Sequence, residues 1–426
     1  MKNSLLFKSV RLNIGFQLGE KIMRLISSLI ITYAILNKID QELYGMMSTF
    51  VVINAMLMVL VTLGIKDKFV IALVNGSASR NLVFRVLIAL FLLVFGVIVF
   101  IQIALILNST EKVEYLCASL VSLQLISNVF IAGRYSAEAA EDFKLVSAVD
   151  LLFNVCSLPL KYYCIVFQNS LNLFLIVLAL ELILSNLVLM LLSRSALLKY
   201  DKNSISLTDL VRSSFPILLS SLVIIIYYRV DQVMISMLVG YSETAIYAAG
   251  SKVTEVLYLI PMTVVAVLFP LMIKSYKESA DSLARTVGPL IFYLVWICVL
   301  GCMLITVFIA PVWGFLFEGK YQESIAVVYI HTWTIPFVAL GIVGSRLYVI
   351  RGFERLLFWR SLAILAINMA LNIPAIILFG AVGAAATTLL CQIVAGLLFD
   401  LVNFKTRSIF NLKITSLLTG FKVHRI

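Results

Sequence analysis

The stretch VFRVLIALFLLVFGVIVFIQIALIL, residues 83–107, decides the fold class of this chain. Apart from Arg85 and Gln102, its residues are apolar or glycine. A helix of this length rises about 1.5 Å per residue and crosses the roughly 30 Å hydrocarbon core of a bilayer. The strands of a transmembrane barrel alternate polar and apolar residues, and this run does not. The stretch therefore predicts a membrane-spanning helix.

Runs of the same kind recur along the chain, which is 62% hydrophobic and 13% charged, against about 25% charged in a soluble domain. The predicted spans cover residues 12–36, 43–65, 83–107, 113–133, 143–167, 171–193, 213–240, 244–273, 287–310, 324–349, 358–379 and 382–404. All six cysteines fall inside spans and show no metal-ligand spacing, so we expect buried apolar residues and no metal site. The predicted fold class is an all-α integral membrane protein with about twelve transmembrane helices.

Lysine and arginine residues are concentrated in alternate connections between the spans. On one side they include Lys66, Arg134 and Lys277, together with both ends of the chain. The other side carries only Lys38, Lys112 and Lys320. Because basic residues favour the cytoplasmic side, we expect both termini in the cytoplasm. Topology thus explains the net charge of +11, and no nucleic-acid partner is expected.

The longest polar connection, residues 194–212, lies near the middle of the chain. It predicts two six-helix lobes, an N-terminal lobe over residues 1–200 and a C-terminal lobe over residues 201–426, with the same orientation in the membrane. The span that holds Arg24 and the span that holds Arg229 occupy matching places in the two lobes. Such a parallel repeat, with no soluble domain inserted, favours a transporter with a central cavity between the lobes.

Several charged residues fall inside the spans, where each costs roughly 2.5 to 3.5 kcal/mol unless it faces a partner or a cavity. Glu20 and Arg24 are four positions apart and are expected to pair, which leaves Lys21 as a surplus cation that an anionic ligand would compensate. The candidates for ion pairing or proton coupling are Glu20, Asp150, Glu181, Asp231 and Glu255.

The seventh and eighth spans are joined by a tight turn near Gly240. In such antiparallel neighbours, residues at equal depth have numbers with a constant sum. This rule predicts two ion pairs, one between Arg229 and Glu255 and one between Asp231 and Lys252. The pairs either fix the packing of the two helices or line the cavity, and the sequence leaves both readings open.

Several segments resemble the O-antigen and polysaccharide flippases, a family of polysaccharide biosynthesis exporters. These segments are LYG (43–45), YRVDQVMI (228–235), IYAA (246–249), KVTEVLYLIPM (252–262), LFP (268–270), NMALNIP (368–374) and FGAVGAAAT (379–387). The resemblance implies the fold of the multidrug/oligosaccharidyl-lipid/polysaccharide (MOP) exporters and the transport of an undecaprenyl-diphosphate-linked oligosaccharide by alternating access.

The resemblance also implies that cationic cavity residues meet the diphosphate of the carrier. The positions that fit are Lys21, Arg24, Arg229 and Lys252. A polar route for the sugars would involve Asn54, Gln124, Asn128, Tyr227 and Tyr228. We expect the partners to be the lipid-linked oligosaccharide, membrane lipids and other membrane proteins of O-antigen or lipopolysaccharide biosynthesis.

Two alternatives remain open. A multidrug-type cation antiporter of the same fold would want surplus carboxylates, whereas the first span offers two bases and one acid. An integral-membrane glycan polymerase usually carries a large external loop, and the external connections here are short. No nucleotide-binding motif occurs. The chain is therefore predicted to be a transport protein without a cofactor and not an enzyme.

Overall fold

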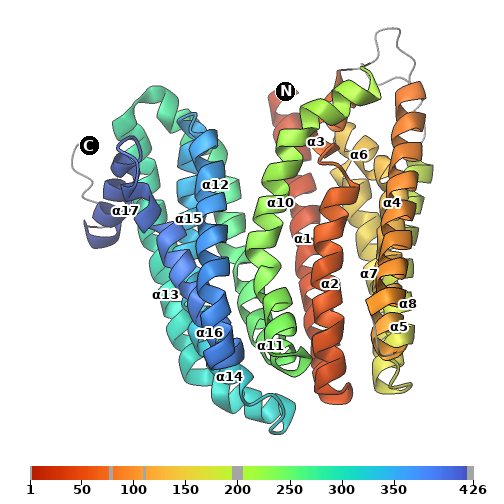
Figure 1. The fold of residues 1–426 in the computed structure, drawn as a ribbon. Helices are drawn as coiled ribbons and strands as arrows, with labels where there is room; N and C mark the ends of the chain where they lie inside the picture. Colours follow the sequence, from red (N-terminus) through yellow and green to blue (C-terminus); the bar gives the residue numbers. More distant parts are fainter. Residues whose placement is uncertain (1, 76–79, 109–111, 194–204, 420–426) are drawn as a thin grey trace. The chain divides into compact units, whose positions relative to one another are not determined.

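The computed structural model describes residues 2–75, 80–108, 112–193 and 205–419. Every regular element in these ranges is a helix (Figure 1). The first nine are α1 (Lys2–Lys38), α2 (Gln41–Val61), α3 (Lys66–Val74), α4 (Arg80–Asn108), α5 (Lys112–Ser122), the 3-10 helix η1 (Leu123–Phe130), α6 (Ile131–Ala139), α7 (Phe143–Val166) and α8 (Leu171–Leu192). The others are α10 (Leu207–Leu238), α11 (Tyr241–Leu257), α12 (Leu259–Glu278), α13 (Ala280–Phe317), α14 (Ser324–Thr332), α15 (Thr334–Ile350), α16 (Glu354–Gly396), the 3-10 helix η2 (Leu398–Leu401) and α17 (Arg407–Thr419).

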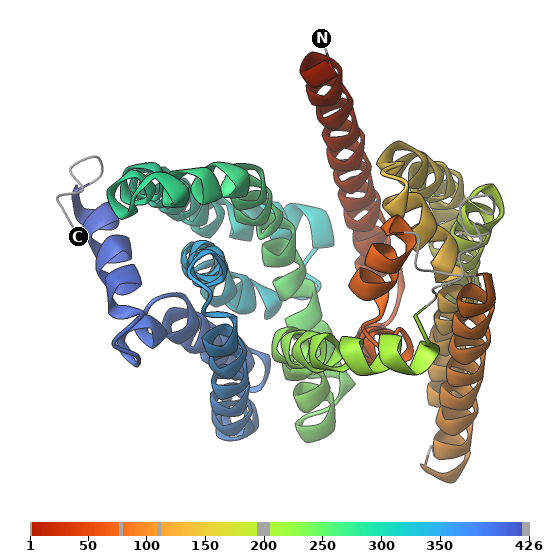
Figure 2. The same ribbon diagram turned by 90° about the horizontal axis from the view of Figure 1, so that it is seen from above.

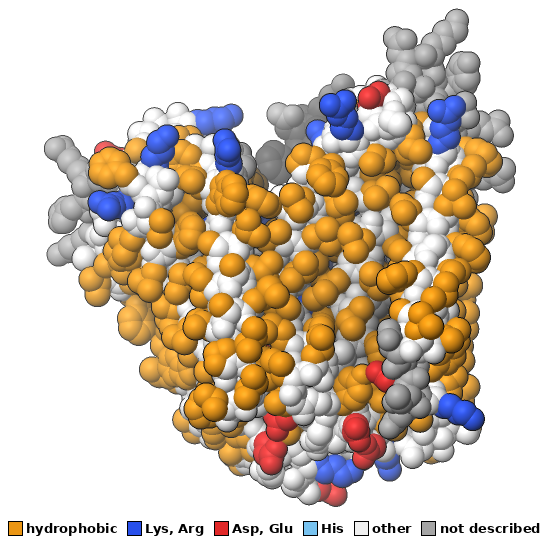
Figure 3. Space-filling model, viewed as in Figure 1, with side chains coloured by type: hydrophobic (Ala, Val, Ile, Leu, Met, Phe, Trp, Pro, Cys, Tyr) orange, Lys and Arg blue, Asp and Glu red, His pale blue; other side chains and the backbone are white. Residues whose placement is uncertain are grey.

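The chain forms two compact units, unit 1 over Met1–Ile225 and unit 2 over Ile226–Ile426, so the division falls inside α10. The predicted lobe boundary at residues 200 and 201 lies outside the described residues. Seen from above, each unit is a bundle of helices standing side by side (Figure 2). The visible sides of both units are covered mainly by hydrophobic side chains, and charged side chains gather near the helix ends (Figure 3). This surface suits contact with lipid.

Within the described residues, ten helical segments are long and apolar enough to cross a membrane. They contain eleven of the predicted spans, because the eleventh and twelfth both lie in the segment Arg355–Leu401. The remaining predicted span is the central part of α1, which carries Glu20, Lys21 and Arg24. The prediction of about twelve transmembrane helices in an all-α fold is confirmed.

The long helix α16 breaks at Gly380, whose backbone angles are φ 55° and ψ −135°. Only glycine adopts such angles readily. A Cβ atom at this position would also lie 2.4 Å from Oε2 of Glu243. That carboxylate accepts a hydrogen bond of 2.8 Å from the backbone N–H of Ala381 and so caps the second segment of α16. The break therefore separates the eleventh and twelfth spans.

In unit 1, α1 packs against α7 and α7 packs against α8. The fourth predicted span is not a uniform α-helix, because the 3-10 helix η1 separates α5 from α6. A Cβ atom on Gly133 of α6 would lie 2.2 Å from the Cα of Met190 on α8. The glycine thus allows a close approach of α6 and α8. Both features bring the polar residues of η1 and α6 against α8.

In unit 2, buried apolar residues of α13 and α15, such as Val287, Cys302 and Val343, form a shared core. The C-terminal helix α17 joins this core through Ile409 and is anchored by a fully buried ion pair of 2.7 Å between Lys413 Nζ and Asp400. Burial lowers the pKa of Lys413 to about 8, against the opposing influence of Asp400. The pair fixes α17 to the bundle of unit 2.

Candidate functional site

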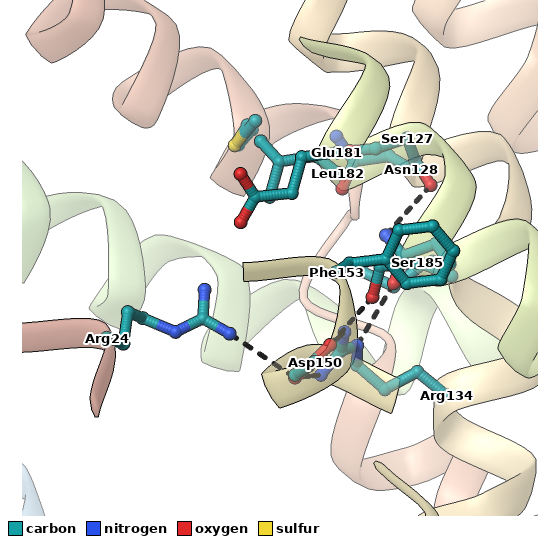
Figure 4. A pocket seen from close by; sticks show the side chains of 12 residues that line it. Arg24, Ser127, Asn128, Arg134, Asp150, Phe153, Glu181, Leu182 and Ser185 are labelled. Carbon is teal, nitrogen blue, oxygen red and sulfur yellow. Dashed lines mark hydrogen bonds and ion pairs between the residues drawn. The ribbon is translucent and has the colours of Figure 1, made fainter. Parts of the chain in front are cut away.

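Unit 1 contains a pocket of about 260 Å³ between α1, η1, α6, α7 and α8 (Figure 4). Its polar lining includes Arg24, Asn128, Arg134, Asp150, Glu181 and Asn186. Two predicted candidates, Asp150 and Glu181, thus face the same cavity together with the predicted cation Arg24. Polar side chains gathered in a membrane-spanning bundle mark a functional site by default.

Two arginines converge on Asp150, whose side chain is 8% exposed. Arg134 binds it in a bidentate fashion, with N–O distances of 2.7 and 2.6 Å, and also donates to Asn186. Arg24 lies 3.5 Å from the same carboxylate and donates to Glu20 at 2.7 Å, as predicted for residues four apart. The close contact of Arg134 fixes Asp150, whereas Arg24, 45% exposed, is the accessible cation of this pair.

Sequence reasoning assigned Arg134 to a cytoplasmic connection, and the structure corrects this. Helix α6 continues to Ala139, so Arg134 lies within a membrane-spanning segment and its side chain is 24% exposed. The 3-10 helix η1 lengthens this span, which places the arginine deeper than a simple count of apolar residues indicates. The sequence signal for this position was Gly133, directly before Arg134, since small residues let helices approach closely inside a membrane. The structure shows this close approach to α8.

A second ion pair in unit 1 joins Lys161 of α7 to Glu181 of α8, with both side chains under 8% exposed. Glu181 also accepts hydrogen bonds from Ser157 and Asn154, at 2.7 and 3.4 Å. Asp150 lies on the same face of α7, because the four α7 positions are spaced by four, three and four residues. The result is a buried polar stripe in which Glu181 is already neutralised.

In unit 2, the predicted pair of Arg229 on α10 and Glu255 on α11 is present, with Nη1 and Oε1 2.5 Å apart. Lys252 also approaches Glu255, at 3.7 Å. The side chains of all three residues are about one third exposed. Two cations therefore share one carboxylate, which leaves positive charge in surplus at this partly exposed cluster.

The predicted pair of Asp231 and Lys252 is wrong. Residues two apart on a helix do not share a face, so Asp231 points away from the side on which Arg229 meets Glu255. Lys252, three positions before Glu255, lies on the Glu255 side of α11 instead. Equal depth in the membrane was the signal used for the prediction, and it does not by itself specify the helix face.

Asp231 is 4% exposed and is surrounded by neutral donors. It accepts hydrogen bonds from Tyr247 of α11 at 3.0 Å and from Asn372 and Thr388 of α16, both at 2.6 Å. Within the described part of the chain, no lysine or arginine forms an ion pair with it. Asp231 is therefore a buried carboxylate without a compensating cation, a costly arrangement that suits a reversible protonation site.

The other predicted residues occupy varied positions. Lys21 lies on the exposed surface of α1 and makes no ion pair with any residue that the structure describes. Of the residues expected to line a sugar route, Asn54, Gln124 and Asn128 are buried in unit 1, and Asn128 lines the pocket. In unit 2, Tyr228 is 43% exposed, whereas the hydroxyl of Tyr227 is buried. The described residues include no group of three or more His, Cys, Asp or Glu arranged to hold a metal ion.

Comparison with solved structures shows which fold the chain shares. The chain is similar to the lipid II flippase MurJ in an inward closed conformation, with a TM-score of 0.70 and 14% identity over 96% of this chain and 91% of that one. It is also similar to an inward-facing multidrug resistance MATE family transporter of the MOP superfamily, with a TM-score of 0.69 and 13% identity over 92% and 96% of the two chains.

A third structure is a MOP superfamily transporter from Pyrococcus furiosus, whose binding pocket is described as having reverse polarity. Its TM-score is 0.63 at 13% identity, with 96% of this chain and 95% of that one covered. These likenesses show that the chain has the fold of the flippase-type and multidrug transporters of the MOP superfamily. No curated protein sequence matches the chain.

The sequence itself identifies the family. Residues 6–276 match the family described as polysaccharide biosynthesis protein. The chain belongs to that family, in agreement with the resemblance noted from its motifs. It is a multi-pass membrane protein of polysaccharide biosynthesis with a transporter fold.

Proposed function

We propose that the protein is a flippase for undecaprenyl-diphosphate-linked oligosaccharide repeat units of O-antigen or a similar surface polysaccharide. It moves them from the cytoplasmic to the periplasmic leaflet of the bacterial inner membrane. The observation that carries the proposal is that a polysaccharide biosynthesis protein presents partly exposed cations on its helices, Arg24 in unit 1 and the pair of Arg229 and Lys252 in unit 2. A lipid diphosphate supplies the negative charge that such residues bind.

The charge balance supports a diphosphate more strongly in unit 2 than in unit 1. Arg229 and Lys252 share the single carboxylate of Glu255, so one positive charge is left for a ligand. In unit 1, Arg24 is partly satisfied by Glu20, and Lys21 adds an exposed cation one helical turn earlier. The four predicted cations therefore remain the proposed diphosphate contacts.

Transport by alternating access would use the two lobes, residues 1–200 and 201–426, as the moving parts, with both termini in the cytoplasm. The parallel repeat inferred from the sequence supports this arrangement, since each lobe would then start on the same side. Among the coupling candidates, Glu20, Asp150, Glu181 and Glu255 each have a cationic partner. Asp231 has none among the described residues, so we assign coupling to Asp231.

A multidrug-type cation antiporter is the second candidate function. The buried carboxylate of Asp231 and the likeness to a MATE transporter favour it. An organic cation would need an accessible carboxylate, however, and Asp231 is 4% exposed. The exposed cluster of unit 2 has the opposite sign, because it contains two cations and one acid.

The location of the lipid-linked glycan in cells lacking the protein tests the proposal. Complete repeat units on their diphosphate carrier are expected to accumulate in the cytoplasmic leaflet, inaccessible to a membrane-impermeant glycan-oxidising reagent until the membrane is opened. Accessible but unpolymerised repeat units would identify a polymerase instead. Normal surface polysaccharide together with increased sensitivity to cationic drugs would favour the antiporter.

A further inference from the structure

The buried Asp231 is connected to a second titratable side chain in unit 2. The Tyr247 hydroxyl lies 3.0 Å from Oδ2 of Asp231 and 3.5 Å from Nε2 of His331. The other ring nitrogen of His331, Nδ1, lies 2.7 Å from the hydroxyl of Thr254. All four side chains are at most 5% exposed. Sequence reasoning attached no role to His331, which lies in α14, far from Asp231 along the chain.

Counting hydrogens assigns the direction of each hydrogen bond. The single hydroxyl hydrogen of Thr254 is donated to the backbone oxygen of Ser251 at 2.8 Å. Thr254 must therefore accept from Nδ1–H of His331, which leaves Nε2 of the neutral ring as an acceptor. Tyr247 has one hydrogen and faces two acceptors, the Asp231 carboxylate and His331 Nε2. The shorter distance places this hydrogen on the Asp231 side in the present state.

We propose that His331, Tyr247 and Asp231 form a proton relay that loads the coupling carboxylate of unit 2. A proton that binds Nε2 of His331 is donated to the oxygen of Tyr247, while the hydrogen of Tyr247 moves to the carboxylate. The N–H bond at Nε2 and the old Tyr247 O–H bond break, and a new Tyr247 O–H bond and an Asp231 O–H bond form. His331 ends neutral, Asp231 ends as a carboxylic acid, and nothing is oxidised or reduced.

The surroundings of the relay favour a proton over a fixed charge partner. The titratable groups that act on it are Glu255 of α11, Tyr258 between α11 and α12, Tyr227 of α10 and Cys391 of α16. Tyr258 contacts the His331 ring, with centroids 6.4 Å apart, but its hydroxyl binds Thr334. None of these groups is a cation. Within these surroundings, Asp231 can therefore be neutralised only by a proton or by a bound cation.

Protonation of Asp231 would change the packing of unit 2. The carboxylate accepts hydrogen bonds from α11 and from both segments of α16, on either side of Gly380. A neutral acid is a weaker acceptor than a carboxylate, so loading the proton loosens all three connections at once. Unloading it draws α10, α11 and both segments of α16 together. The relay thus supplies a two-state element, as a coupled transporter requires.

This inference rests on the proposed function, because glycan flipping is the motion that the proton would drive. The test uses the full chain in proteoliposomes, with flipping of a diphosphate-linked oligosaccharide measured under an imposed pH gradient. Tyr247→Phe keeps the ring but removes the hydroxyl and is expected to reduce gradient-driven flipping about tenfold or more. Tyr258→Phe, which also removes a hydroxyl beside His331, is the matched control and should flip at the wild-type rate.

An infrared titration of the same proteoliposomes separates failure of the relay from failure of the function. The relay predicts a pH-dependent carboxylic-acid band that is absent in Asp231→Asn. In Tyr247→Phe this band should grow more slowly after a drop in pH. Both results would support the relay even if no glycan is flipped. Wild-type flipping by Tyr247→Phe, or flipping driven by sodium ions and indifferent to pH, would overturn the relay and leave the flippase intact. Absence of the band under all conditions would likewise overturn it.

Discussion

At the scale of single residues, the two arginines that share Asp150 illustrate how similar charges acquire different roles. Arg134 is held by two short contacts to the carboxylate and a third to Asn186, so its guanidinium has little freedom to bind anything else. Arg24 approaches the same carboxylate at 3.5 Å and is 45% exposed. We therefore infer that Arg134 stabilises the fold, whereas Arg24 contacts the ligand.

Replacing these two arginines should separate stability from transport. Arg24→Ala is expected to abolish export of the glycan while the amount of folded protein in the membrane stays normal, and Arg24→Lys should retain part of the activity. Arg134→Ala leaves a buried carboxylate without its close partner and should destabilise the fold by about 3–5 kcal/mol. Thermal unfolding of the purified variants and surface-polysaccharide assays provide the two measurements. Full export by Arg24→Ala would remove this residue from the site.

Charge reversal tests whether Arg229 and Glu255 only pack two helices or also meet the ligand. The double variant Arg229→Glu with Glu255→Arg restores opposite charges at the same two positions and should recover the membrane abundance lost in each single variant. Export should stay low, because the reversed acid on α10 repels a diphosphate. Recovery of export to the wild-type rate would show that the pair only joins the helices.

At the scale of elements, the sequence was sufficient for the spans and insufficient for their interruptions. Hydropathy located eleven of the predicted spans in helical segments long and apolar enough to cross a membrane, because burial in lipid demands a long apolar run. It could not reveal the change to 3-10 geometry at η1 or the breaks at Tyr258 and Trp333, which depend on contacts with neighbouring helices. The same gap explains two errors: the depth of Arg134 follows from the interrupted span that continues to Ala139, and the partners of Asp231 follow from the helix face that it occupies.

The turn at Gly380 gives a prediction for α16. Gly380→Ala combines an unfavourable backbone conformation with a Cβ that would lie 2.4 Å from Glu243, so it should lower the free energy of unfolding by about 1–3 kcal/mol. Gly301→Ala is the matched control, because no atom lies within 4 Å of its added Cβ and its helix is regular. Equal melting temperatures for the two variants would contradict the requirement for glycine at residue 380.

The anchor of α17 gives a second prediction at this scale. Lys413→Met leaves Asp400 buried without its cation and should destabilise unit 2 by about 3–5 kcal/mol, whereas Lys413→Met with Asp400→Leu should recover most of this loss. Melting curves of the three proteins decide the point. A double variant no better than the single one would mean that the hydrogen bond that Asp400 accepts from Tyr348 matters more than the charge pair.

The pH dependence of this anchor has a definite sign. Folding lowers the pKa of Lys413 from 10.5 to about 8, so the unfolded chain binds more protons at this lysine between those values. The penalty for its charge is therefore full below about pH 8 and is relieved as the pH rises towards 10.5. Compared with Lys413→Met, the wild type should gain stability across this window, and a falling difference would contradict the lowered pKa.

At the scale of the whole molecule, the two compact units divide inside α10 and not at the central linker. The start of α10 belongs to unit 1, because Leu210 is buried in an apolar cluster with Phe69 of α3 and Val86 of α4. The end of the helix belongs to unit 2 and carries Arg229 and Asp231. The predicted boundary at residue 200 was placed in the longest polar connection. The boundary in the structure, between Ile225 and Ile226, instead reflects which helices pack together.

This difference predicts how the chain behaves when it is cut. Fragments 1–199 and 200–426, expressed together, should copurify, since the start of α10 in the second fragment still packs on the first. Introducing Leu210→Asp into the second fragment should prevent copurification by placing a charge in that apolar cluster. Equal recovery with and without the substitution would show that other contacts hold the fragments together.

The carboxylate of Glu243 has a consequence for how the protein is made. The two spans of α16 are joined at Gly380 without a polar loop, in the apolar sequence LFGAVGAA of residues 378–385. As the ribosome completes this hairpin, Glu243 has already been synthesised and delivered to the membrane. The backbone N–H of Ala381, at the start of the last span, can then donate at once to the Glu243 carboxylate. Biogenesis therefore proceeds in the order that the cap requires.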